Sequence, residues 1–127
     1  MTEINAFGGT FRGTAEGDHG VFTNKFTGTV YAGQIAGDSA CVGVLTFTDG
    51  NTAFVECDAD GQPHGRALGC YADGHTVYSR CEHGSRKEDA LLRADGTCTY
   101  NGEACRADYA PFVALQAMVV PIKARPP

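Results

Sequence analysis

Alternating apolar and polar residues along the chain predict β-strands. The clearest segments are Gly43–Thr48 (Gly-Val-Leu-Thr-Phe-Thr) and Ala67–Ala72 (Ala-Leu-Gly-Cys-Tyr-Ala). Successive side chains of a strand point to opposite faces, so this period of two is typical of strands with one buried face. Asp49-Gly50 and Asp73-Gly74 directly follow these segments. Such pairs favour tight type I′ turns, and the pattern therefore predicts β-hairpins.

The hairpin pattern repeats along the chain. Five aromatic residues occur at spacings of 24, 23, 24 and 22 residues: Phe7, Tyr31, Phe54, Tyr78 and Tyr100. A third pair, Asp95-Gly96, keeps the same position relative to its aromatic residue. In Thr27–Tyr31 the segment from the glycine to the aromatic residue is one residue shorter. A lone hairpin is only marginally stable, so the units must stack. We expect a mostly β fold, an elongated single antiparallel sheet of roughly nine or ten strands over residues 1–104.

These motifs resemble the MORN repeat family. Phe7–Phe11, Tyr31–Ile35 and Tyr100–Ala104 resemble its opening phrase, an aromatic residue followed by Gly two positions later. Gly61–Gly65 (Gly-Gln-Pro-His-Gly) and Tyr71–Gly74 resemble its centre and its close. The resemblance covers roughly residues 5–104, with units that start near 7, 31, 54, 78 and 100. It implies a sheet of stacked hairpins that serves as a scaffold for other proteins.

The repeats are degenerate in two respects. The chain contains no Trp, and the family's Trp position is held by Phe11, Ile35, Asp58, Glu82 and Ala104. Glu56 and Arg80 replace the expected Gly in the third and fourth units. The alternative to the MORN interpretation is another twisted-sheet or small-barrel fold whose near-periodicity is accidental.

The last segment, residues 105–127, does not follow the repeat. It is rich in Ala, Leu and Met and predicts a short capping helix that begins near Asp108, with Pro111 in its first turn. The apolar positions 112, 113, 115, 118 and 119 form one face, which we expect to pack on the sheet. Docking of this helix on a partner or on a second copy is the alternative. Pro121 ends the helix, and residues 122–127 are expected to form a loose or partner-held tail.

Composition and charge narrow the possible partners. The chain has 127 residues, of which 43% are hydrophobic and 20% charged, as expected for one folded domain. Its net charge of −5 argues against nucleic acid and against anionic membrane lipid as partners. The first residues, Met1–Asn5, show no secretory signal, so the predicted location is the cytoplasm or another reducing intracellular compartment.

Cysteine and histidine spacing gives no metal motif. The six cysteines include no Cys-x-x-Cys pair and predict reduced, mostly buried thiols, although Cys98 and Cys105 could meet across a turn. The histidines lack the spacing of a zinc site and are interpreted as turn-packing or exposed polar residues: His19, His64, His75 and His83. We therefore expect neither a metal nor a cofactor.

The best binding candidates are seven aromatic residues: Phe7, Tyr31, Phe47, Phe54, Tyr71, Tyr78 and Tyr100. An exposed row of them would form a platform for a peptide or helix, whereas the competing interpretation buries them beneath the C-terminal helix. Because no catalytic constellation is present, we expect a noncatalytic protein-binding scaffold or an accessory subunit of a larger assembly. It could also form a homodimer through the helix or the sheet end. The alternative is a small enzyme or ligand-binding protein with a pocket on the concave face.

Overall fold

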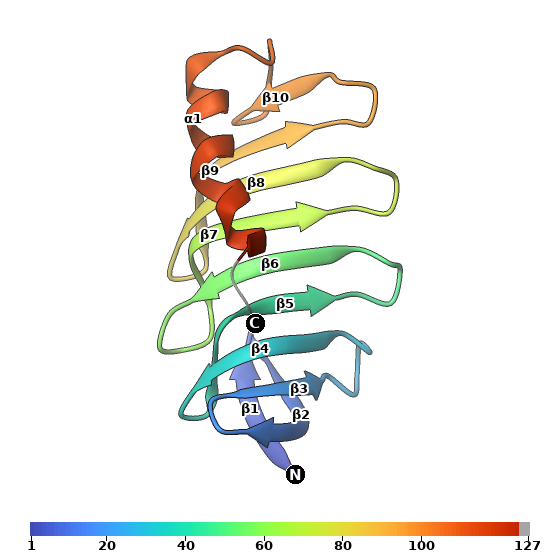
Figure 1. Ribbon diagram of the computed structural model, residues 1–127, viewed down its shortest axis with the longest axis vertical. Coiled ribbons are helices and arrows are strands. Elements are labelled where there is room, and N and C mark those ends of the chain that lie inside the picture. Colours follow the sequence, from blue (N-terminus) through green and yellow to red (C-terminus); the bar gives the residue numbers. More distant parts are fainter. Residues whose placement is uncertain (125–127) are drawn as a thin grey trace.

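The computed structural model describes residues 1–124, and side chains up to Ile122. In this part of the chain, eleven strands form an antiparallel meander in which each strand pairs with the next (Figure 1). The strands are β1 (Thr2–Ala6), β2 (Gly9–Glu16), β3 (His19–Thr23), β4 (Val30–Ala36), β5 (Ser39–Thr46), β6 (Thr52–Cys57), β7 (Pro63–Cys70), β8 (Thr76–Glu82), β9 (Ser85–Leu92), β10 (Cys98–Tyr100) and β11 (Glu103–Cys105). The prediction of a mostly β fold is confirmed.

The first five strands close into a barrel. β1 pairs with β2 and also, in parallel, with β5 through Asn5 and Ser39. The backbone N–H of Asn5 donates a hydrogen bond to the carbonyl oxygen of Asp38 over 2.7 Å. The barrel is filled by buried side chains, among them Ile4, Phe11, Phe22, Tyr31 and Leu45. The prediction of a single elongated sheet is therefore wrong, because a closed barrel occupies one end and strands β6–β11 extend from it. Closure also covers the edge of β1 that an open sheet would expose.

Glycines permit the tight coiling of the barrel. Gly33 on β4 lies opposite Gly43 on β5, and a Cβ atom added to Gly33 would lie 2.5 Å from the Cα atom of Gly43. Any side chain at this position would separate the two strands. The register of β4 also shifts between Gly33 and Ile35, an irregularity of the kind that increases local twist. These features let the sheet curl far enough for β1 to meet β5.

One α-helix covers one face of the open sheet (Figure 1). α1 (Ala110–Val119) has Pro111 in its first turn, and Phe112, Leu115 and Val119 are buried against the sheet. The prediction of this helix is confirmed, but its buried face is narrower than expected, because Val113 and Met118 are partly exposed. No helix within residues 1–124 is both long and apolar enough to cross a membrane.

The chain continues past α1 as a short 3₁₀ helix, η1 (Val120–Ala124). Ile122 of η1 is buried in the same core as α1. The prediction of a loose tail is thus wrong at Ile122, because this side chain contributes to the apolar core. The rest of the predicted tail, residues 125–127, lies outside the described residues.

The Asp-Gly pairs do not form the type I′ turns that were predicted. Within Phe47–Asn51 only Gly50 has a positive φ, and the N–H of Gly50 donates to the carbonyl oxygen of Phe47 over 3.1 Å. This pattern matches a type I turn followed by a left-handed glycine. Tyr71–His75 and Arg93–Thr97 have the same hydrogen bonds. Positive φ at two consecutive residues, as type I′ requires, occurs at Phe7-Gly8, His83-Gly84 and Asn101-Gly102.

Candidate functional site

The predicted aromatic residues do not form one row. Tyr31 pairs with Leu45, which pairs with Ala53, so the next residue, Phe54, points to the opposite face from Tyr31. Residues one position out of register lie on opposite faces of a sheet. The shorter segment at Thr27–Tyr31, which makes the spacing from Tyr31 to Phe54 an odd 23 residues, is the sequence signal of this offset.

The candidates accordingly divide among three places. Phe7 and Tyr31 belong to the barrel core, and Phe54, Tyr78 and Tyr100 belong to the core beneath α1. Phe47 and Tyr71 lie at the turn end of the sheet and are 37% and 40% exposed. Of the seven residues, these two present the most exposed aromatic surface to a partner.

The buried tyrosine hydroxyls have partners within the fold. Tyr31 donates a hydrogen bond to the carbonyl oxygen of Gln34 over 2.6 Å and accepts one from the N–H of Cys41 over 3.2 Å. Burial raises the pKa of Tyr31 above its usual value, although the bond from Cys41 lowers it in part. The hydroxyl of Tyr78 accepts a hydrogen bond from the side-chain amide of Gln116 on α1 over 3.1 Å. These two tyrosines therefore have structural roles.

A half-open groove of about 370 Å³ lies on the face of β6–β8 that α1 leaves uncovered. Small residues line its floor: Ala53, Ala67, Gly69 and Ser79. Phe47 and Tyr71 line one end, and Pro63, Cys81 and Arg86 line the other. The lining is mostly apolar, so the groove suits an apolar segment or side chain.

The polar groups of the groove do not form a catalytic pair of nucleophile and base. Burial raises the pKa of the Cys81 thiol, while Arg86 and Arg80 lower it to a smaller extent. The thiol is therefore held in its neutral and less reactive form. At the rim, His75 stacks on Tyr71 with ring centres 4.2 Å apart, and its Nδ1 contacts the carboxylate of Asp73. This arrangement fixes the orientation of the Tyr71 ring.

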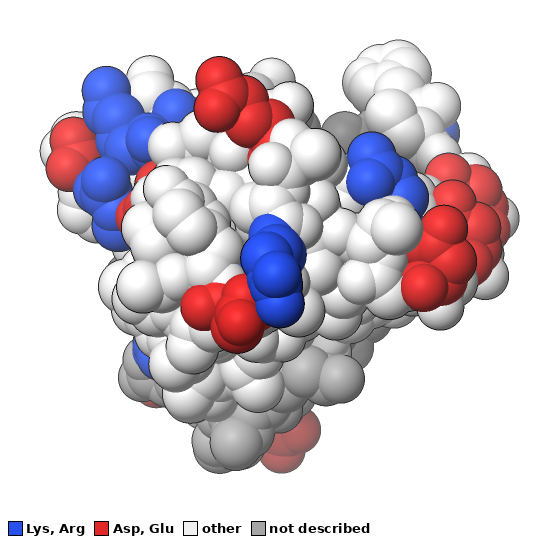
Figure 2. All heavy atoms as spheres, turned by 90° about the horizontal axis from the view of Figure 1, so that it is seen from above, with Lys and Arg blue, Asp and Glu red and all other residues white. Residues whose placement is uncertain are grey.

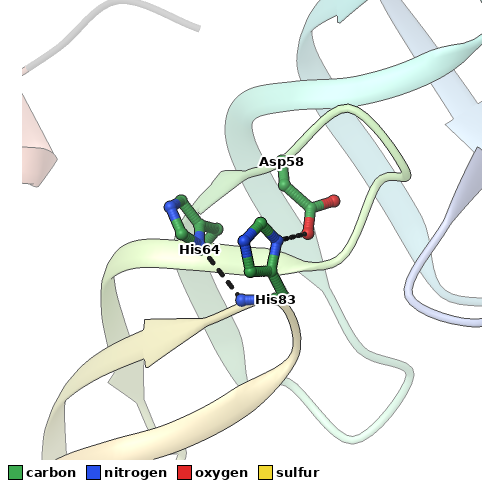
Figure 3. A group of neighbouring side chains, drawn as sticks. All are labelled: Asp58, His64 and His83. Carbon is green, nitrogen blue, oxygen red and sulfur yellow. Dashed lines mark hydrogen bonds and ion pairs between the residues drawn. The ribbon is translucent and has the colours of Figure 1, made fainter.

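Three potential metal ligands meet at the other end of these strands, as Figure 3 shows. Asp58, His64 and His83 each offer a ligand atom, and these atoms lie within 4.8 Å of one another. Nδ1 of the His83 ring lies 2.9 Å from Oδ2 of Asp58. The backbone N–H of His83 donates a hydrogen bond to Nδ1 of His64 over 3.0 Å. The cluster joins the β6–β7 turn to the β8–β9 turn.

Hydrogen bonds stabilise the charged form of Asp58. The bond with His83 and then the N–H groups of Gln62 and Asp60 lower the pKa of Asp58 below its usual value. Sequence reasoning missed this cluster because it treated each histidine separately. The signal was available in the hairpin order, since every second turn of a meander lies at the same end of the sheet.

Two basic residues near the helix, Arg66 and Arg80, are paired with acidic groups. Arg66 forms bonds of 2.8 and 3.0 Å with the carboxylate of Glu56, and Arg80 contacts Glu88 over 3.3 Å. Tyr100 donates a further hydrogen bond to Glu88, which raises the pKa of Tyr100. Figure 2, seen from the end at which β10 lies, shows basic side chains beside acidic ones. Among the described residues in this view, basic side chains therefore do not form the isolated patch that anionic lipid would require.

Comparison of the chain with models of protein families gives no match, and comparison with curated proteins gives no match either. Function must therefore be inferred from the geometry of the groove and of the side chains around it.

Proposed function

We propose that the chain is a noncatalytic protein-binding scaffold that holds an apolar segment of a partner protein on the open face of its sheet. The groove on the face opposite α1, with Phe47 and Tyr71 at its rim, is the observation that carries this proposal. Exposed aromatic side chains beside an apolar groove are typical anchors of protein interfaces. The volume of about 370 Å³ can receive a few side chains of such a segment.

The groove favours a binding role over the alternative of an enzyme. Its floor consists of short side chains and glycine, which offer contact surface but few reactive groups. A catalytic thiol would require a lowered pKa or a base within hydrogen-bonding distance. The thiol of Cys81 has a raised pKa instead, and so does Cys57, whose pKa burial raises to about 12.

We further propose that the hairpins are degenerate MORN-type repeats. The turns at Phe47–Asn51, Tyr71–His75 and Arg93–Thr97 share the same hydrogen bonds and recur at intervals of 24 and 22 residues, which supports this view. The barrel formed by β1–β5 is the feature that such a repeat sheet does not predict.

Site-specific photo-cross-linking tests the proposed groove. A photoreactive residue replaces Val77, which lines the groove, and in a second protein it replaces Val113, which is 44% exposed on α1. We expect a discrete partner from an extract of the native cells to cross-link at position 77 and not at 113. Calorimetry with the purified partner should then give saturable binding by the unmodified chain.

The double variant Phe47→Ala/Tyr71→Ala should weaken this binding by about tenfold or more, because hot-spot aromatics contribute on the order of 2 kcal/mol each. Phe26→Ala is the matched control, since Phe26 is exposed but lies in the β3–β4 turn, outside the groove. Equal affinity of the double variant and the control would refute the groove as the interface. A small molecule retained in native mass spectrometry, and lost in the double variant, would instead support the ligand-binding alternative.

A further inference from the structure

Asp58, His64 and His83 lie at the same end of the sheet, on or next to the neighbouring strands β6, β7 and β8. Asp58 begins the turn after β6, His64 is the second residue of β7, and His83 opens the turn after β8. The pairing of β7 with β8 places Gly65 opposite Cys81, which brings the neighbouring His64 to the level of the β8–β9 turn. Figure 3 shows the two imidazole rings and the carboxylate gathered on one side of these turns.

Hydrogen bonds already orient the three groups. Oδ1 of Asp58 accepts the N–H groups of Asp60 and Gln62 over 2.9 and 3.1 Å, while Oδ2 is directed at His83. The rings of His64 and His83 lie 4.4 Å apart, inclined by 32°. In metal sites, outer hydrogen bonds such as those from Asp60 and Gln62 hold a carboxylate ligand in position.

We propose that Asp58, His64 and His83 form a binding site for a divalent transition-metal ion, with Zn²⁺ as the preferred ion. Two imidazole nitrogens and one carboxylate oxygen are a zinc ligand set that leaves the fourth coordination position to water. Ca²⁺ and Mg²⁺ are disfavoured because they take oxygen ligands. Each histidine binds as a neutral imidazole through its unprotonated nitrogen, and His64 must first give up the hydrogen bond that its Nδ1 accepts from the backbone N–H of His83.

Small side-chain movements complete the site. Bonds of about 2.0–2.1 Å to zinc place tetrahedral ligand atoms roughly 3.4 Å apart. The three ligand atoms lie within 4.8 Å of one another, and Nδ1 of His83 lies 2.9 Å from Oδ2 of Asp58, so metal binding requires small adjustments of these separations. The His83 side chain is 76% exposed and can turn without displacing the core, whereas that of Asp58 is 9% exposed and provides a fixed ligand. Metal binding would thus clamp the β6–β7 turn to the β8–β9 turn.

The other turn end of the sheet supplies a matched control. Nδ1 of His75 contacts the carboxylate of Asp73 there, and Tyr71, which is not a zinc ligand of this type, stacks on the histidine ring. The pair therefore has one histidine and one carboxylate without the second imidazole. It should bind Zn²⁺ much more weakly than the cluster at Asp58.

The test uses the full chain with its cysteines reduced, titrated with Zn²⁺ alone and followed by calorimetry and by NMR of the histidine ring protons. We expect one ion per chain and perturbed resonances for His64 and His83, with those of His19 and His75 unchanged. His64→Gln and His83→Asn should each weaken binding by at least about tenfold, since loss of even an outer-shell partner costs that much. His75→Gln should bind as the unmodified chain does.

Free thiols compete for zinc, so a second metal identifies the ligand type. Co²⁺ bound to thiolate gives an intense charge-transfer absorption that nitrogen and oxygen ligands do not give, and we expect a spectrum without this band. A thiolate band, the lack of saturable binding, or unchanged affinity in His64→Gln would overturn the proposal. If circular dichroism shows that a variant is unfolded, NMR of the unmodified chain still decides, because it identifies the histidines that contact the metal.

Discussion

Gln116 on α1 and Tyr78 on β8 share a hydrogen bond of 3.1 Å across the helix–sheet interface. The ring of Phe112 meets Tyr78 edge-on, with centres 6.1 Å apart. Leu115 and Val119 are buried beside this contact. Apolar burial therefore holds α1 on the sheet, and the hydrogen bond contributes to its alignment.

The helix contact predicts a large effect of Phe112→Ala. Removal of a buried Phe side chain leaves a cavity and costs about 3–5 kcal/mol in the free energy of unfolding. Urea unfolding measures this loss. The control Val113→Ala should change stability by less than about 0.5 kcal/mol, because Val113 is partly exposed. Similar losses in the two variants would show that α1 is not docked as described.

The packing of the β6–β7 turn on the barrel predicts a difference between two glycine substitutions. Gly61 and Gly17 both have positive φ, of 76° and 64°, so Ala at either position should cost about 1 kcal/mol in backbone strain. A Cβ atom at Gly61 would lie 2.4 Å from the carbonyl oxygen of Asn5, whereas one at Gly17 meets nothing within 4 Å. Gly61→Ala should therefore cost a further 1–3 kcal/mol, roughly the cost of overpacking. Equal losses in the free energy of unfolding of the two variants, measured in urea, would show that the β6–β7 turn does not pack against β1.

The parts of the fold that depend on local sequence could be predicted. The alternation in Ala67–Ala72 and the composition of α1 are local signals, and both elements form. Barrel closure could not be read in this way, because it depends on a contact between Asn5 and Ser39 and on the cumulative twist of the strands between them. The aromatic row failed for a related reason, since Tyr31 is in register with Ala53 and therefore points to the face opposite that of Phe54.

The candidate sites were less accessible to sequence reasoning. The groove is lined by small residues such as Ala67 and Gly69, which carry no recognisable motif and gain meaning only when adjacent strands place them together. The Asp58 cluster combines residues of two turns with His64 at the start of β7, and their proximity follows from strand register. In each case the strands had to be paired before the neighbours could be known.

The buried hydroxyl of Tyr31 predicts a loss of stability in alkaline solution. Tyrosine in the unfolded chain ionises near pH 10, about its usual pKa, whereas burial raises the pKa of Tyr31 in the folded chain. Above about pH 10 the folded state retains a proton that the unfolded state has lost, so the free energy of unfolding falls as the pH rises. Urea unfolding at a series of pH values measures this slope.

Tyr31→Phe is the variant that isolates this effect. At neutral pH it should cost about 1–2 kcal/mol, because the carbonyl of Gln34 and the N–H of Cys41 lose their partner. Above about pH 10 its stability should fall less steeply than that of the unmodified chain. Parallel pH profiles for the two proteins would show that Tyr31 ionises as freely in the folded state as in the unfolded one.

Cys98 on β10 and Cys105 on β11 lie directly opposite each other, as their sequence positions across a turn suggested, and both are free thiols. Opposed residues of an antiparallel pair have Cα atoms about 4.5–5.5 Å apart, within the range that a disulfide bridges. Burial, and secondarily Cys98, raise the pKa of Cys105, so the reactive thiolate is scarce at neutral pH. Mild oxidation should therefore form a Cys98–Cys105 disulfide slowly, and faster as the pH rises.

Peptide mapping by mass spectrometry identifies the bond. Cys57, with its pKa of about 12, should remain reduced. An equal yield of intrachain disulfide in Cys105→Ser would show that other thiols pair instead.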